Sequence, residues 1–429
     1  MLQGTENKKL PSLYAILPYF VLSSLSLLVV MVLLYYTGTE VRGHYFQPKL
    51  LAVTHVATLG LITPIIFGSL LMILPVVLEV RVYSEKLSAA TFILLVSGLP
   101  LLTYAFWNFQ AGPVMQVGGV MVFLSLSIFC INFFLSVRDC QKWKIEADLI
   151  SSSVIWLFIT ALIGTLLVFN FSYAFIPVSH LEMLKIHANL GLAGWFFMLI
   201  AGVSSRLIPM FLLVHNVNTD KLKFTWYTGN AGLAALAVAF YFELPAAYIF
   251  VCSLFVVAAV VFYIFFMLEV YRKRFRKGLD TGMKLTFYAF IFLGVSIVLG
   301  SLSPFSFLKE EYMMLVRVAF GFAVLLGFCG VLVVGQGIKI LPFIIWTYKY
   351  KDLAGKGGVP LPKDLVSERL SRYTMGGLLI GLLGVFASIV FGYSLLMSLS
   401  CGVLIVTALL HNINMFKAIL HKPYLKNMR

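Results

Sequence analysis

Long apolar segments are the feature of this sequence that most limits its fold. Twelve blocks, each long enough to cross the roughly 30 Å apolar core of a bilayer, follow one another with short polar connections. A bilayer offers no water to backbone groups, so these blocks must be helices that satisfy their own hydrogen bonds. We predict an all-α membrane protein of twelve transmembrane helices, forming a single membrane domain over residues 1–429. The predicted spans are 13–36, 49–78, 88–108, 114–137, 149–170, 185–213, 225–243, 246–270, 285–304, 313–346, 374–393 and 396–418.

The distribution of charge orients these helices and argues against nucleic acid as a partner. The chain carries a net charge of +15, and 61% of its residues are hydrophobic, far more than a water-soluble surface allows. Most of the 32 Lys and Arg residues fall in loops and tails on one side, for example at 272–277. This positive-inside bias predicts that both termini are cytoplasmic and that the basic loops meet anionic lipid head groups. The outer side holds five basic residues: Arg42, Lys49, Lys185, Lys309 and Arg317.

A short motif recurs three times at nearly constant spacing. It consists of a glycine, three residues, then Met, Arg or Lys, two branched aliphatic residues and a proline; the prolines are 134 and 133 residues apart. Glycine lets helices approach closely in a bilayer, and proline bends or ends a helix. Four helices fit in each interval, so we predict three pseudo-symmetric four-helix repeats, at about 13–137, 149–270 and 285–418. The three copies are Gly68–Pro75, Gly202–Pro209 and Gly335–Pro342.

The opposite ends of the same three helices carry candidate ligands. His55 and His187 stand near the outer ends of the second and sixth predicted helices, and Arg317 takes the corresponding place on the tenth. An ionisable residue inside a transmembrane segment is expensive without a partner, so it marks a functional position. Imidazole suits heme iron, copper and zinc, whereas a thioether prefers Cu(I). The predicted metal ligands on this side are His44, His55, His180, Met183 and His187.

Each of these residues also has a structural interpretation. His55 and His187 are alternatively hydrogen-bonded between helices, while His44 and His180 are alternatively solvated at the interface. Arg317 either binds an anion such as a heme propionate through its two-pronged guanidinium or extends its charge to the outer interface.

The topology and the two histidine-bearing segments resemble subunit I of the heme–copper oxidase superfamily. The match is closest over residues 49–77 and 180–213, and it is most like the short homologues found without partner subunits. The resemblance implies twelve helices in three arcs, with ligands on helices 2, 6, 7 and 10 near the outer face. It implies that His55 binds a low-spin heme and that His187 occupies a copper-ligand position.

Several of that family's ligands are absent from this sequence. Residues 226–243, in helix 7, contain no histidine, helix 10 contains none, and Leu190 and Gly191 stand where helix 6 would carry the motif His-x3-Tyr. The usual heme–copper dinuclear centre therefore cannot be assembled. The chain also resembles, more distantly, membrane proteins of the nitric-oxide response, in which heme and copper binding occur on a reduced plan. We expect a heme b protein of the bacterial plasma membrane, in respiratory electron transfer or NO and O2 handling. Quinol or a respiratory partner subunit is its expected electron partner, and a standard cytochrome oxidase activity is not expected.

Two other classes of function stay open at this stage. In the first, the chain is a copper transporter or an oxidase-assembly protein, with Cu bound by His55, His180, Met183 and His187 at the outer face. In the second, it is an unrelated twelve-helix transporter, although such transporters usually repeat as two halves of six helices. A heme absorption band would distinguish the heme protein from both.

Overall fold

All regular secondary structure in the described part of the chain is helical. The computed structural model describes residues 10–302, 309–354 and 358–422. Eleven helices within these ranges are long and apolar enough to cross a membrane, which is the architecture of a multi-pass membrane protein. Both chain ends, predicted to be cytoplasmic, and the last two residues of the predicted span 285–304 lie outside the described residues.

The helices group into two compact units. Unit 1 consists mainly of residues 73–278, and unit 2 of residues 12–72, 279–296 and 314–429. The helices of unit 1 are α4 (Glu85–Trp107), α5 (Pro113–Val137), α6 (Ile145–Tyr173), α7 (His180–Asn189), η3 (Leu190–Phe197), α8 (Met198–Leu212), α9 (Asp220–Tyr241) and α10 (Ala246–Arg272). Those wholly or mainly in unit 2 are α1 (Leu13–Thr37), η1 (Gly38–Arg42), α2 (Pro48–His55), η2 (Val56–Ile62), α3 (Thr63–Val77), α11 (Thr281–Leu302), α12 (Glu310–Phe322), η4 (Ala323–Gly330), α13 (Val331–Tyr350), η5 (Lys351–Leu353), η6 (Pro362–Leu365), α14 (Glu368–Phe391) and α15 (Ser394–Ile419).

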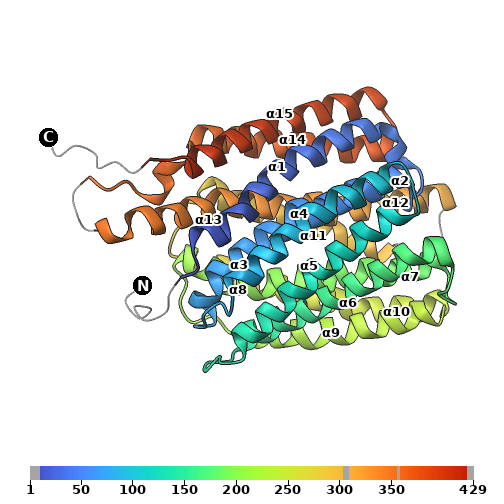
Figure 1. Ribbon diagram of the computed structural model, residues 1–429, viewed down its shortest axis with the longest axis horizontal. Coiled ribbons are helices and arrows are strands. Elements are labelled where there is room, and N and C mark those ends of the chain that lie inside the picture. Colours follow the sequence, from blue (N-terminus) through green and yellow to red (C-terminus); the bar gives the residue numbers. More distant parts are fainter. Residues whose placement is uncertain (1–9, 303–308, 355–357, 423–429) are drawn as a thin grey trace. The chain divides into compact units, whose positions relative to one another are not determined.

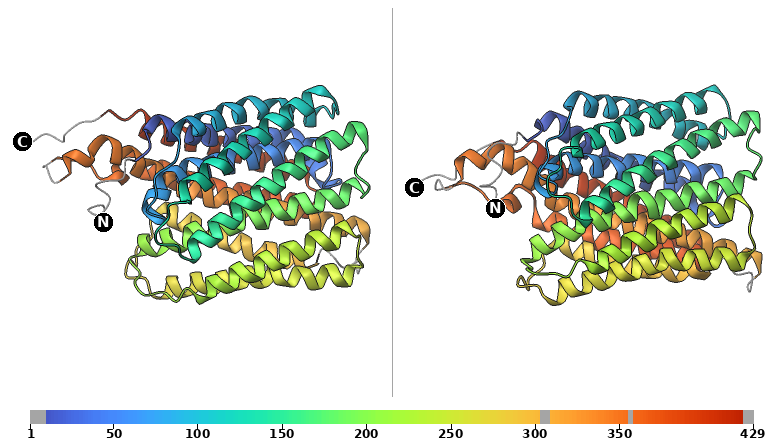
Figure 2. Two further views of the ribbon diagram at one scale, coloured as in Figure 1. Left: turned by 60° about the horizontal axis from the view of Figure 1, so that its bottom comes forward. Right: turned by 90° about the horizontal axis from the view of Figure 1, so that it is seen from below.

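The same order of elements recurs three times along the chain. A single helix is followed by a long helix with a π-helical middle section, and then by a hairpin of two helices. The hairpins are α4–α5, α9–α10 and α14–α15, and the partners of each run side by side (Figures 1 and 2). Glycines permit the close approach: a Cβ on Gly118 would lie 2.7 Å from the backbone N of Leu102, and one on Gly232 2.8 Å from that of Val256.

Three π-helical sections interrupt the long helices, a feature that hydropathy does not predict. They begin at Val56, Leu190 and Ala323, at intervals of 134 and 133 residues, the same spacing as the repeated prolines. In a π-helix the backbone hydrogen bonds run from i to i+5, so the turn is wider, and such turns often occur at functional sites. Each section follows one of the three predicted ligand positions on the same long helix.

Helix α9 is less apolar than a typical membrane span. It overlaps the predicted span 225–243, beginning five residues earlier and ending two earlier, but it is not among the eleven apolar candidates. Polar residues in its first half explain this difference, and three of their side chains are hydrogen-bonded within the protein. Thr225 and Thr228 donate to carbonyl oxygens one turn earlier, and Asn230 accepts from the indole of Trp156 on α6. These internal bonds reduce the cost of placing polar groups in an apolar environment.

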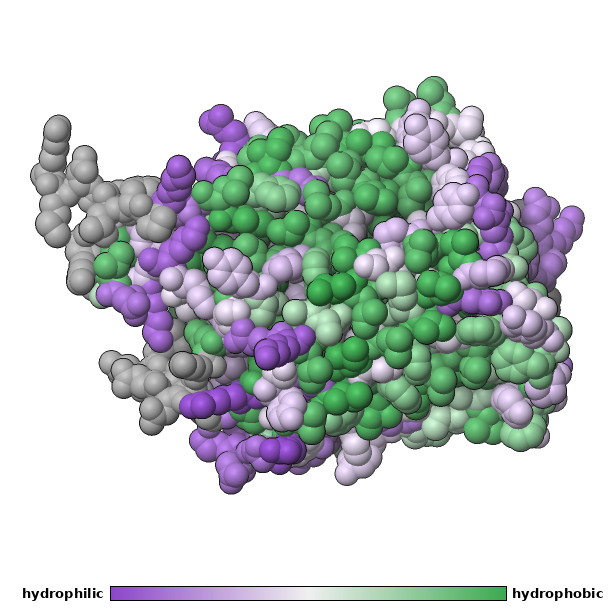
Figure 3. All heavy atoms as spheres, in the orientation of Figure 1, coloured by the Kyte–Doolittle hydropathy of each residue, from purple (hydrophilic) through white to green (hydrophobic). Residues whose placement is uncertain are grey.

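Large apolar side chains remain exposed on the outer faces of the helices. On α14 and α15, for example, Ile380 is 68% and Leu395 is 70% exposed. Figure 3 shows hydrophobic side chains over the middle of the helices and hydrophilic ones toward their ends. This banding is what a lipid bilayer requires of the surface that it covers.

Candidate functional site

His55 is the last residue of α2 and stands directly before η2, in unit 2. Its side chain is half-buried, and Nδ1 lies 2.7 Å from the carbonyl oxygen of Leu51, one turn earlier. A carbonyl oxygen can only accept, so Nδ1 carries the proton. In the neutral ring, Nε2 then holds the lone pair, and this is the form of imidazole that binds a metal.

His187 lies on α7, in unit 1, and is positioned by the neighbouring helix α6. Its Nδ1 donates to the carbonyl oxygen of Thr160 at 3.0 Å. The ring packs against Gly164, where an added Cβ would come within 2.7 Å of Cε1. Helix α6 thus offers an acceptor for Nδ1 and space for the ring. Metal-binding histidines are commonly oriented by such a bond from the second nitrogen to a carbonyl group.

The other two outer histidines have the opposite pattern of hydrogen bonds. In the exposed loop before α2, Nδ1 of His44 accepts from the backbone N–H of Phe46 at 3.0 Å. Nδ1 of His180 lies 3.3 Å from the side-chain nitrogen of Asn170, whose oxygen accepts from the backbone N–H of Ile176. Because Nδ1 accepts in both rings, the proton sits on Nε2, and a metal would have to displace one of these bonds. The four predicted histidines therefore fall into two classes.

Met183, the predicted thioether ligand, is part of an apolar core in unit 1. It is 8% exposed and packs with residues of α6, α7, η3 and α9, among them Leu167, Ile186 and Phe240. The sulfur of a methionine fills such irregular apolar spaces well. The structure therefore places Met183 and His180 in different surroundings, although both lie on α7.

The remaining predicted residue, Arg317, is half-buried on α12, in the long helix that continues into η4. Within the described ranges, no group of three or more His, Cys, Asp or Glu residues could hold a metal ion. A metal site that takes all its ligands from such a group therefore lacks support. A heme needs only one or two imidazoles, because the porphyrin supplies four nitrogen ligands.

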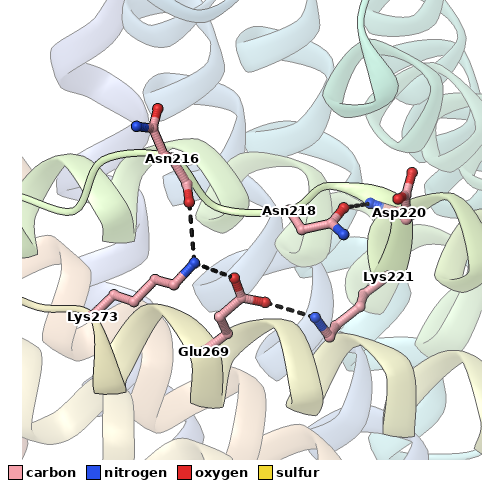
Figure 4. A network of polar contacts seen from close by, with 6 residues as sticks. All are labelled: Asn216, Asn218, Asp220, Lys221, Glu269 and Lys273. Carbon is pink, nitrogen blue, oxygen red and sulfur yellow. Dashed lines mark hydrogen bonds and ion pairs between the residues drawn. The ribbon is translucent and has the colours of Figure 1, made fainter.

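A separate polar network lies at the end of α10 and is structural (Figure 4). Glu269 accepts from Lys221 at 2.6 Å and from Lys273 at 2.8 Å, and Lys273 also donates to the backbone oxygen of Asn216 at 3.2 Å. Each oxygen of the carboxylate thus accepts from one lysine ammonium group. This network ties the segment between α8 and α9 to the last turn of α10.

Two positioning residues are invisible to sequence reasoning. Thr160 contributes only its backbone oxygen to His187, and Gly164 contributes only the absence of a side chain. Both lie inside the apolar span 149–170, where neither differs from ordinary packing residues. The recurrence of His near the start of helices 2 and 6 was detectable, but its supporting contacts were not.

Comparison with known proteins adds one distant relative. No family model matches this sequence. A protein of Aquifex aeolicus (strain VF5), described only as uncharacterized, is 23% identical over 311 residues, which are 72% of this chain and 75% of that protein. The chain is thus similar to a bacterial protein over 72% of its length, and this similarity carries no activity with it.

Proposed function

We propose that this chain is a membrane heme protein built on the subunit I plan, in which His55 and His187 would each offer an imidazole nitrogen to heme iron. The plan includes twelve transmembrane helices in three four-helix repeats, with both termini cytoplasmic, in a bacterial plasma membrane. The threefold order of elements and the π-helical sections at repeat spacing support it.

One observation carries the proposal: His55 and His187 both bind a backbone carbonyl group through Nδ1. In the neutral form of each ring this bond fixes the proton on Nδ1 and leaves the lone pair on Nε2, the nitrogen that an iron would take. The two residues stand at comparable places in different repeats, each shortly before a π-helical section.

A bound heme b would supply one-electron exchange and the capacity to bind NO or O2. The backbone carbonyl groups of Leu51 and Thr160 orient the two imidazoles. Arg317 is the candidate to pair with a propionate, since guanidinium matches a carboxylate in shape and charge. No described contact gives comparable support to copper transport, because Met183 is in an apolar core and His180 accepts at Nδ1.

Absorption spectra of the detergent-purified protein, oxidised and dithionite-reduced, test this function. The protein should be produced in cells supplied with heme, and heme content should be measured as the pyridine complex. We expect a Soret band in the wild-type protein and a large loss of heme in His55→Ala and His187→Ala. His44→Ala and His180→Ala are the matched controls and should keep it. A wild-type protein with no Soret band, or equal heme in all four variants, contradicts the proposal.

A further inference from the structure

The repeated glycine motif brings a cation close to a carboxylate at the inner end of α8. A Cβ on Gly202 would lie 2.8 Å from Cγ1 of Ile150 and 3.2 Å from the backbone oxygen of Glu146, so α8 and α6 nearly touch here. Arg206 follows one turn later on α8, and Glu146 stands in the first turn of α6. Both residues belong to unit 1.

The corresponding glycine and basic residue in unit 2 lie beside an acidic residue, and there the two charged side chains form an ion pair. Gly335 packs against α11, where its Cβ would lie 2.7 Å from Cβ of Leu285. Lys339, one turn later, binds Oδ2 of Asp280 through Nζ at 2.5 Å. Asp280 stands 55 positions before its glycine, and Glu146 stands 56 positions before Gly202. The two acidic residues therefore stand within one position of each other relative to the repeated glycine.

In unit 1 a cavity of about 20 Å³ takes the place of that ion pair. Its lining includes two carboxylates and three basic side chains: Glu79, Glu146, Lys142, Lys144 and Arg206. Lys142 already pairs with Glu79 at 3.1 Å. Glu146 is only 8% exposed, and its Oε2 has no hydrogen-bond partner within the described part of the chain.

The arrangement of charges defines the ligand. A buried carboxylate oxygen requires a hydrogen-bond donor, and a positively charged donor compensates it best. The cavity is about the size that one or two water molecules occupy, so it accepts a primary ammonium group and excludes a trimethylated one. Lys144 and Arg206 are exposed, and both are suited to a phosphate. The site thus matches a molecule with a phosphate and, a few atoms away, an ammonium group.

We infer that this recess binds the headgroup of a phosphatidylethanolamine-type lipid, with the ammonium group at Glu146 and the phosphate at Lys144 and Arg206. The lipid is the source that the location favours. The recess is lined by the loop between α5 and α6 and by the end of a membrane-spanning helix, on the basic side that meets lipid head groups. The inference is independent of heme binding.

Native mass spectrometry of the purified full-length chain tests the site with no variant at all. The protein is offered phosphatidylethanolamine, its N-methylated derivative or phosphatidylcholine with the same acyl chains, and lipid retention is compared. We expect retention to fall with each added methyl group, by roughly tenfold overall, as expected for loss of a charge-assisted hydrogen bond. Equal retention of the three lipids overturns the inference, and so does equal retention of phosphatidylglycerol, which has no ammonium group.

Variants then assign the two halves of the site. Glu146→Gln should abolish the preference for phosphatidylethanolamine over phosphatidylcholine, whereas Arg206→Gln should weaken retention of both. Lys277→Gln, an exposed basic residue outside the cavity, should behave as wild type. An unchanged preference in Glu146→Gln, or an equal loss in Lys277→Gln, refutes the assignment. Soluble phosphoethanolamine that competes as well as the lipid would overturn the lipid source and leave a small zwitterion as the ligand.

Discussion

Replacing Gly164 by alanine should weaken heme binding although it replaces neither of the proposed ligands. The added carbon would lie 2.7 Å from Cε1 and 3.2 Å from Nδ1 of His187, whereas carbon atoms ordinarily approach to about 3.5–4.0 Å. The ring must therefore retreat by about 1 Å. Its Nδ1 now lies 3.0 Å from the oxygen of Thr160, so this retreat would carry it beyond hydrogen-bond range.

The size of the effect follows from these distances. Loss of the hydrogen bond costs about 0.5–1.5 kcal/mol, and the overpacking costs about 1–3 kcal/mol. Loss of an orienting bond to a ligand histidine usually lowers affinity about 10–100-fold. We therefore expect Gly164→Ala to bind heme about 10–100-fold more weakly, and to unfold at a lower temperature.

Spectrophotometric titration of the heme-free protein with heme measures this affinity. Gly294→Ala and Gly402→Ala are matched controls, since an added Cβ at either position meets no atom within 4 Å. Both glycines lie in helices that are apolar enough to cross the membrane. If Gly164→Ala bound heme as tightly as these controls, the role given to His187 and its positioning by α6 would be wrong.

Three further predictions concern stability. The pKa of His421 is lowered by burial and by neighbouring lysine charges, and its neutral Nε2 accepts from the hydroxyl of Tyr350 at 2.7 Å. The unfolded chain therefore binds more protons below about pH 6.5. The contribution of His421 to the free energy of unfolding is thus present above that pH and is lost as the pH falls through the folded-state pKa. In His421→Gln, the melting temperature should depend less on acid pH. Asp280→Asn removes the carboxylate that pairs with Lys339 and should lower the free energy of unfolding by about 1–3 kcal/mol; a melting temperature unchanged in denaturation scans would contradict this. Met183→Ala should cost about 2–5 kcal/mol by opening a cavity in its core yet leave heme affinity unchanged, and a copper-binding defect with intact stability would instead favour the copper hypothesis.

The helices were predictable because hydropathy reports directly on a bilayer. The predicted span 49–78 and the observed Pro48–Val77 differ by one residue at each end. The predicted span 185–213 begins late, because polar residues of α7 such as Glu182 extend the helix beyond the apolar stretch. We also predicted a membrane span at α9. This helix is long enough to cross a bilayer, but its threonines and Asn230 lower its mean hydropathy.

The candidate site was predictable only at the level of residue type. The positions of the histidines in the sequence identified four candidates, but they could not show which ring nitrogen carries the proton in each. That choice depends on backbone carbonyls and amides, such as those of Leu51 and Phe46, which every residue possesses. The cavity at Glu146 escaped prediction for a similar reason, because the closed pair at Lys339 and the open one at Arg206 have the same sequence pattern.

The π-helical sections have a consequence for how the two ends of each long helix evolve. A wide turn holds one residue more than an α-helical turn, and deleting that residue would rotate the downstream helix by about 100° relative to the upstream part. His55 would then lose its present orientation relative to Gly68, and His187 relative to Gly202. The extra residue thus sets the rotation of one end of the helix relative to the other. The end with the predicted ligand and the end with the repeated glycine can therefore each face its own neighbours.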